Sequence, residues 1–239
     1  MVDGDVGSGA VDGLVGNRLA LVGAGIYLLE WVAILASPPP GPVGPGTSAA
    51  QIEASYAGHA GPAGFAAAWF AVVLVGRILY VAAVKASLRG SPRELPLLDL
   101  AVGAMVASVV LEITSYGMVA AAARLATDRA AESVVVVGLD GAAYWIDLLI
   151  WGPIGVSVLA AGLAMLRSRA FSLWLCWLAV GAGSVGILGC LLSEASAGRS
   201  WAGVADAVTG LAALGMWVWM LSTGVVLFRR GKNVSAVTG

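Results

Sequence analysis

Charged residues are scarce in this chain: they make up 11% of its 239 residues, whereas hydrophobic residues make up 59%. Soluble domains carry roughly 25% charged residues, because a chain folded in water needs polar surface to cover its core. This deficit excludes an ordinary water-soluble domain. Apolar runs recur along the whole chain, and a run of about 20 residues is long enough to cross the hydrocarbon core of a bilayer.

Residues that hold metals and cofactors are also few. The single histidine, His59, excludes a bis-histidine haem site within the chain, and no lysine falls mid-membrane, which excludes a retinal Schiff base. Cys176 and Cys190 lie in one predicted helix, about 21 Å apart by the helical rise, too far for a disulfide. No Walker, Rossmann or HExxH pattern occurs. We therefore predict no cofactor and no metal site, and the net charge of −1 gives no reason to expect a nucleic-acid partner.

The apolar runs and the breaks between them predict an all-α, polytopic transmembrane bundle of six spans within residues 17–230. A disordered tail, 1–16, precedes it and a cytoplasmic tail, 231–239, follows it. The prolines that follow Ser37 end the first span, because proline lacks a backbone donor. The predicted spans are residues 17–37, 65–88, 97–125, 142–166, 171–192 and 204–228.

Two connecting segments carry further expectations. The Pro/Gly-rich loop 38–64 should lie outside the membrane, with a short helix from about Ser48 to Tyr56. The sequence of segment 126–137 has two interpretations: it is either an extended surface piece or part of a helix. Within the fourth span, Pro153 predicts a kink and a free carbonyl near Leu149.

Basic residues fall in alternate connections, which predicts a topology with both termini cytoplasmic. The composition, rich in Ala, Gly, Val and Arg, indicates a bacterial inner membrane protein. One set of connections holds Arg18, Lys85, Arg89, Arg93, Arg167, Arg169, Arg229, Arg230 and Lys232; the other holds only Arg124, Arg129 and Arg199.

Four charges lie well inside predicted spans, one in each of the first four. A charge at the bilayer centre costs about 2.5–3.5 kcal/mol, so the four should face the bundle interior. The acidic residues at predicted helix ends, Asp99, Asp140 and Asp206, are instead expected to be solvated caps or first-turn acids. The four internal charges are Glu30, Arg77, Glu112 and Asp147.

Each internal charge has a tyrosine three or four residues away, on the same helix face. The third span adds two serines to that face. Together they predict a polar seam drawn from four helices, in which a phenol can donate to a carboxylate. The added residues are Tyr27, Tyr80, Tyr116, Tyr144, Ser108 and Ser115.

The seam has two interpretations. As a binding site, it holds three carboxylates against one arginine, so at least one of Glu30, Glu112 and Asp147 should be protonated or hold a cation, and Arg77 should reach at least one of them. In the structural interpretation, the same charges only hold helices together and bind no ligand. Gly183, Gly186 and Gly189 recur every three residues and predict close helix packing elsewhere in the bundle.

Three segments of the C-terminal half resemble the bacterial DUF4386 family of uncharacterised six-helix membrane proteins. They are GLAMLRSRA at 162–170, LCWLAVGAG at 175–183, and WVWM at 217–220 followed by FRR at 228–230. Ala170 and Phe171 stand where the family's helix–turn–helix unit often has a proline. The resemblance implies a six-span fold with a long outer loop, and it implies no activity, cofactor or site residue.

The sequence thus leads to two functional hypotheses. The first is transport or sensing of a small solute, proton or cation through the intramembrane seam. The alternative is a non-catalytic scaffold or accessory subunit in the lipid bilayer. An enzyme is not expected, because no nucleophile–base pair and no metal set is present.

Overall fold

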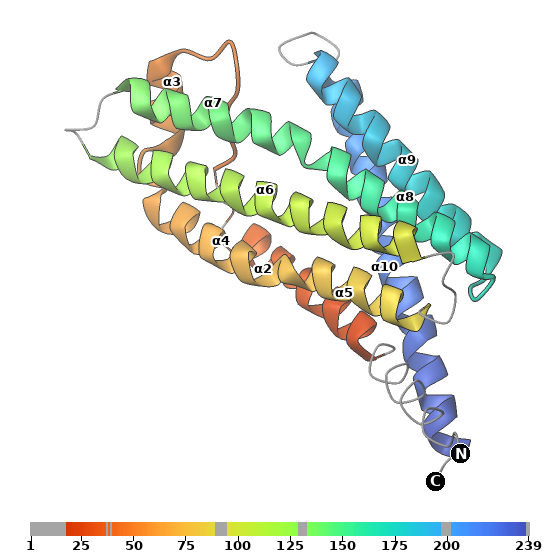
Figure 1. The fold of residues 1–239 in the computed structure, drawn as a ribbon. Helices are drawn as coiled ribbons and strands as arrows, with labels where there is room; N and C mark the ends of the chain where they lie inside the picture. Colours follow the sequence, from red (N-terminus) through yellow and green to blue (C-terminus); the bar gives the residue numbers. More distant parts are fainter. Residues whose placement is uncertain are drawn as a thin grey trace.

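The computed structural model describes residues 18–36, 38, 40–88, 95–128, 133–196 and 202–237, with side chains through residue 230. Within these ranges every regular element is a helix, and the chain is an all-α bundle (Figure 1). Six helical stretches are long and apolar enough to cross a membrane, as the sequence predicts. They are Arg18–Ala36, Ala60–Ser87, Leu95–Thr127, Ser133–Ser168, Leu173–Ser196 and Ala202–Arg230.

Three of the six stretches are interrupted. The first breaks at Leu29, the second at Leu74 between α4 and α5, and the fourth at Ile150 between α7 and α8. The helices are α2 (Glu30–Ala36), α3 (Ala49–Tyr56), α4 (Ala60–Val73), α5 (Val75–Ser87), α6 (Leu95–Thr127), α7 (Ser133–Leu149), α8 (Trp151–Ser168), α9 (Leu173–Ser196) and α10 (Ala202–Val237).

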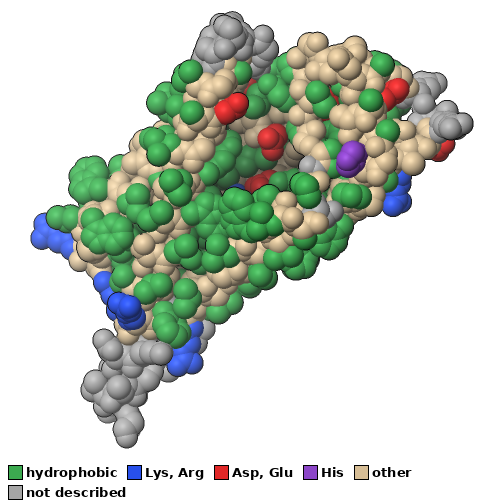
Figure 2. Space-filling view, turned by 180° about the vertical axis from the view of Figure 1, so that it is seen from behind, with side chains coloured by type: hydrophobic (Ala, Val, Ile, Leu, Met, Phe, Trp, Pro, Cys, Tyr) green, Lys and Arg blue, Asp and Glu red, His purple; other side chains and the backbone are tan. Residues whose placement is uncertain are grey.

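The outer face of the bundle is apolar, as a lipid-facing surface requires. Large hydrophobic side chains are well exposed on several helices, among them Leu35 at 78%, Val72 at 66% and Leu211 at 62%. Figure 2 shows apolar side chains over most of one face, with basic side chains gathered mainly toward one end. In water such a surface drives association, whereas lipid tails accept it directly.

Several predicted boundaries are wrong. The second span begins at Ala60 rather than 65, so the end of the predicted loop 38–64 is helical; Pro62 is compatible with this because the first helical turn needs no donor from it. The fourth span begins at Ser133 rather than 142, since the Val134–Val137 run is helical. The helix α10 continues to Val237, into the predicted tail. The predicted N-terminal tail lies outside the described residues.

The break in the fourth span confirms the prediction made from Pro153. Helix α8 starts at Trp151, so Pro153 is in its first turn, where proline is tolerated. Proline cannot donate to the carbonyl oxygen of Leu149, and the thiol of Cys190 lies 3.9 Å from that oxygen instead. The first span breaks without proline: the carbonyl oxygen of Leu29 accepts the indole N–H of Trp69 at 2.7 Å.

Asp140 fastens the outer loop to α7. Its carboxylate accepts the backbone N–H of Val43 at 2.8 Å, that of Gly44 at 3.2 Å and the hydroxyl of Tyr56 at 2.8 Å. The prediction that Asp140 is a solvated cap is therefore wrong, because its side chain is buried. Burial and the bond to Asp140 raise the pKa of the Tyr56 phenol, so it stays protonated and keeps donating. The predicted helix at Ser48–Tyr56 is present as α3, with Ser48 and Gln51 forming a capping box.

Glycines bring two pairs of helices into backbone contact. A Cβ added to Gly23 would lie 2.7 Å from the carbonyl oxygen of Gly76 on α5. A Cβ added to Gly155 on α8 would lie 2.7 Å from the carbonyl oxygen of Gly183 on α9. Both separations are too short for any larger residue, so the close packing expected at Gly183 is confirmed and a second contact of the same kind lies next to the charged residues.

We predict that Gly183→Ala destabilises the bundle by about 1–3 kcal/mol, since the added methyl group forces α8 and α9 apart. Gly181→Ala is the matched control, because nothing lies within 4 Å of a Cβ there. Thermal unfolding of the two variants in detergent measures the difference. Equal stability of the two would contradict the packing described here.

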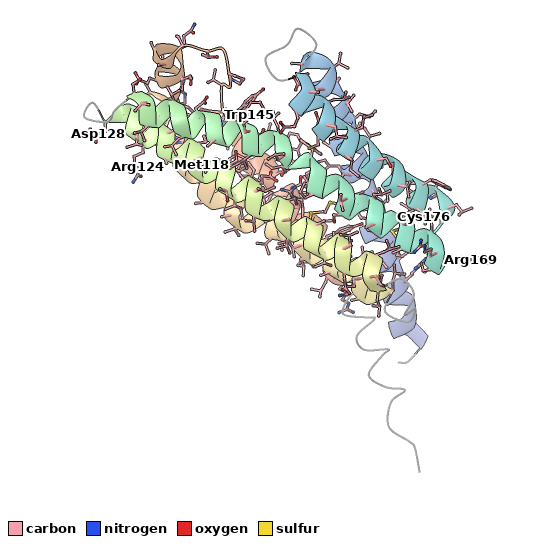
Figure 3. All side chains as sticks on the ribbon, turned by 45° about the horizontal axis from the view of Figure 1, so that its top comes forward. Met118, Arg124, Asp128, Trp145, Arg169 and Cys176 are labelled. Atoms are coloured by element: carbon pink, nitrogen blue, oxygen red, sulfur yellow. The ribbon has the colours of Figure 1, made fainter. Side chains whose placement is uncertain are left out.

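Charged residues mark the two ends of the bundle. Arg124 and Asp128 lie at the end of the α6–α7 hairpin, and Arg169 lies at the opposite end, where α8 meets α9 (Figure 3). The outer loop and α3 pack against α7 and α6. We expect the α3 end to face outside and the Arg169 end to face the cytoplasm, following the bias of basic residues.

In a cysteine-free background (Cys176→Ala, Cys190→Ala), an impermeant maleimide should label Ala50→Cys in intact cells. Ser172→Cys, which is also exposed, should be labelled only after permeabilisation. Labelling of both positions from outside would contradict the six-span topology.

Candidate functional site

Arg77 and Glu112 form a buried ion pair at the centre of the bundle. Arg77 comes from the first turn of α5 and is 1% exposed; the Glu112 side chain, from the middle of α6, is 15% exposed. One guanidinium NH₂ group donates to Glu112 Oε2. The prediction that Arg77 reaches at least one carboxylate is thus confirmed. The Arg77 Nε atom is buried with no hydrogen-bond partner among the described residues.

An aromatic stack holds the other side of Arg77. Its guanidinium carbon lies 4.8 Å from the ring centroid of Tyr27, in a cation–π contact. The Tyr27 ring in turn stacks on Trp217 of α10, at 4.2 Å and 5° between planes. The contact of Gly23 with Gly76 explains this arrangement, because each glycine lies within about one helical turn of a member of the stack.

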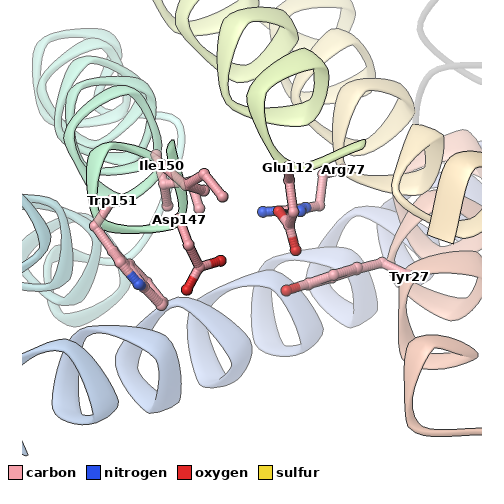
Figure 4. Close-up of a pocket in the computed structure, with 7 residues that line it drawn as sticks. Tyr27, Arg77, Glu112, Asp147, Ile150 and Trp151 are labelled. Carbon is pink, nitrogen blue, oxygen red and sulfur yellow. Dashed lines mark hydrogen bonds and ion pairs between the residues drawn. The ribbon is translucent and has the colours of Figure 1, made fainter. Parts of the chain in front are cut away.

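Asp147 lines a pocket beside the ion pair. The pocket has a volume of about 220 Å³, and the Asp147 side chain is exposed to it. In Figure 4 the Asp147 carboxylate and the Trp151 indole extend from one side, while Glu112 and the Tyr27 hydroxyl face them from the other. The lining residues are Tyr27, Arg77, Glu112, Asp147, Ile150, Trp151 and Ile154.

Asp147 lies further from the start of its helix than the sequence suggests. It is 14 residues from Ser133, the first residue of α7, which is about 21 Å at the helical rise. The sequence places it only about 8 Å from the outer end, because the first turns of α7 were not counted as helix. Glu112 is in the middle of the 33-residue α6, so the pocket lies within the membrane-spanning part of the bundle.

Glu30 is close to the pocket without lining it. It is the first residue of α2, directly after the break at Leu29, and it is 7% exposed. Its carboxyl group lies near Tyr27, Arg77 and Glu112. All four internal charges predicted from the sequence therefore gather in one region.

The remaining members of the predicted seam have mainly packing roles. Tyr80 is fully buried and meets Trp219 edge-on at 5.2 Å, and Tyr116 stacks on Phe70 at 4.1 Å. Ser108 donates within its own helix to Met105, whereas Ser115 donates to the carbonyl of Ala143 and so joins α6 to α7. Tyr144 packs over Gly44 in the outer loop. None of these five residues lines the pocket.

The sequence interpretation missed the apolar half of the pocket. Ile150, Trp151 and Ile154 follow Asp147 at intervals of three, four and seven residues, which is one helical face. That spacing could have revealed them. It was overlooked because aromatic and branched residues in a span are ordinarily lipid-facing or core residues.

One face of the bundle is hollowed. Figure 2 shows a hollow on this face, with acidic side chains at its edge and in its depth. Glu194 of α9 and the exposed Asp206 of α10 lie near Tyr144 of α7. The Glu194 Oε1 atom is buried without a hydrogen-bond partner among the described residues. Acidic groups at an opening attract cations and repel anions.

The chemistry of the pocket follows from its charge. Arg77 and Glu112 neutralise each other, and Asp147 forms no ion pair or hydrogen bond among the described residues. A carboxylate in a water-accessible intramembrane pocket with no protein cation opposite it can bind a proton or a cation. No group of three or more His, Cys, Asp or Glu residues suited to a metal ion occurs in the described part of the chain.

No protein-family model matches the chain, and no curated protein or solved structure is significantly similar to it. The function must therefore be argued from the pocket itself.

We predict that Arg77→Met destabilises the protein by about 3–5 kcal/mol, because it leaves the Glu112 carboxylate buried and unpaired. The double variant Arg77→Met/Glu112→Leu should recover much of that loss, because it removes both charges. Lys85→Met is the control: it breaks the exposed Lys85–Asp99 pair and should cost less than about 1 kcal/mol. Thermal unfolding in detergent compares the three, and a double variant no more stable than Arg77→Met would contradict a paired Arg77–Glu112 unit.

Proposed function

We propose that this protein transports or senses a small cation or a proton through the intramembrane pocket, and that Asp147 is the group that binds it. The proposal is based on how the three acidic side chains around Arg77 are paired and buried. Glu112 lines the pocket but pairs with Arg77, and Glu30 is buried beside Tyr27. Asp147 is exposed to the pocket and forms no ion pair in the described part of the chain.

The helix breaks support the same proposal. The interruptions at Leu29, Leu74 and Ile150 each lie within three residues of an internal charge: Glu30, Arg77 and Asp147 respectively. The backbone stays helical at Leu74 and Ile150, so these are local changes in the hydrogen-bond pattern and not unwound segments. Irregular helix segments at membrane depth are a common feature of ion and substrate sites in transporters.

The competing proposal is a membrane scaffold whose charges only join helices. The Arg77–Glu112 ion pair joins α5 to α6, and the hydrogen bond from Ser115 to Ala143 joins α6 to α7, so both fit a scaffold. Asp147 does not, since a carboxylate that joins no other side chain costs free energy in a membrane without stabilising the bundle. This difference is why we favour a binding function.

Two further proposals concern the membrane in which the protein lies and the family to which it belongs. We place the protein in a bacterial cytoplasmic membrane with both termini inside, on the strength of its composition and of the basic residues at one end. We also keep membership of the DUF4386 family as a proposal, supported by the three motifs of the C-terminal half.

Asp147→Asn tests the function. In liposomes that contain the purified protein and a pH-sensitive dye, cation- or proton-dependent flux should fall to the level of empty liposomes. In detergent, the rise of the melting temperature with cation concentration should disappear, and this readout applies equally to a sensor that transports nothing. Both effects follow because the amide cannot carry the negative charge.

Asp99→Asn is the matched control, since Asp99 is an exposed residue at the start of α6. It should leave flux and ligand dependence unchanged. If Asp147→Asn folds normally and keeps every cation-dependent response, the binding function is wrong and the scaffold proposal remains.

A further inference from the structure

The pocket has an apolar half that a proton or an alkali-metal ion would not use. Beside Asp147, the side chains of Ile150, Trp151 and Ile154 form one wall. Figure 4 shows the indole of Trp151 alongside the Asp147 carboxylate, both directed into the pocket. An indole face is the strongest aromatic partner for a cation, and it attracts organic ammonium groups in particular.

We infer that the ligand of this pocket is a small organic ammonium ion with a single positive charge, whose charged group binds Asp147 and whose apolar part packs on Trp151, Ile150 and Ile154. This inference rests on the proposed function and names the class of cation. The carboxylate supplies the charge partner, the indole supplies a cation–π contact, and the two isoleucines supply apolar surface.

Charge limits the ligand to one positive group. The pocket holds two carboxylates and one guanidinium, and Glu112 already engages the guanidinium. A second ammonium group would meet the Arg77–Tyr27 wall, where the neighbouring charge is positive. A zwitterion such as an amino acid fits no better, because it brings a third carboxylate beside Glu112 and Asp147.

Size limits the ligand further. A volume of about 220 Å³ is below the range of roughly 300–1,000 Å³ found for pockets that take drug-sized ligands. It corresponds to about seven water molecules at roughly 30 Å³ each. Tetramethylammonium and isobutylammonium are of suitable size. A divalent metal ion is a poor fit, because such ions prefer six or more oxygen ligands and the side chains of Ile150, Trp151 and Ile154 supply none.

The test is binding of tetramethylammonium and isobutylammonium chlorides to the purified full-length protein, by calorimetry and by shift of the melting temperature. Potassium chloride at equal ionic strength and glycine are the comparison ligands. Both ammonium ions should bind and raise the melting temperature above the potassium value, and glycine should not. Asp147→Asn should abolish this binding.

Trp151 provides the specific readout. Trp151→Leu should weaken ammonium binding about three- to thirty-fold, the range expected for a lost cation–π contact. Trp151→Phe should give an intermediate loss, and it covers the case in which the leucine variant does not fold. Trp174→Leu is the matched control, since Trp174 is 56% exposed on α9 and outside the pocket.

The outcomes separate the two proposals. If the wild-type protein binds ammonium no better than potassium, or if both Trp151 variants bind as tightly as wild type, the ammonium inference is overturned. In that case an Asp147-dependent proton or potassium response would still support the proposed function. If Asp147→Asn changes no response at all, the proposed function fails and the ammonium inference fails with it.

Discussion

The ion pair between Arg77 and Glu112 is the interaction on which the site depends. A guanidinium within a membrane is tolerated only when a partner neutralises it, and the pair meets this condition by joining α5 to α6. The Tyr27 ring covers the other side of Arg77 and stacks on Trp217, so the same cation also connects the first span to α10. With the arginine engaged in this way, Asp147 is left as the accessible charge of the pocket.

The close contact of the first span with α5 makes this arrangement possible. Gly23 and Gly76 let the two backbones approach until no side chain fits between them, which brings Tyr27 over Arg77. The breaks at Leu29 and Leu74 lie within two turns of that contact. Close packing and interrupted helices thus occur together around the charges. The α8–α9 contact at Gly155 and Gly183 includes the backbone of Trp151, which packs near Gly186, so it also positions the α8 side of the pocket.

The architecture and the charged half of the site could be predicted from the sequence, because the cost of charge in lipid forces Glu30, Arg77, Glu112 and Asp147 inward. The rest depends on contacts between distant residues. The break at Leu29 is capped by an indole 40 residues away, and the burial of Asp140 depends on backbone N–H groups 96 and 97 residues away. No local pattern reveals such partners. Helix starts at Ala60 and Ser133 were missed for a different reason, since Pro62 and the valine run favour other structures when considered alone.

The attachment of the outer loop to Asp140 also connects that loop to the helix of the pocket. Asp140 and Asp147 are on the same helix, α7, two turns apart, and α7 ends at the break beside Ile150. Three hydrogen bonds from Val43, Gly44 and Tyr56 make the loop and α3 part of the same rigid unit as α7. The segment that presents Asp147 to the pocket is therefore fastened to the extramembrane loop through its own helix.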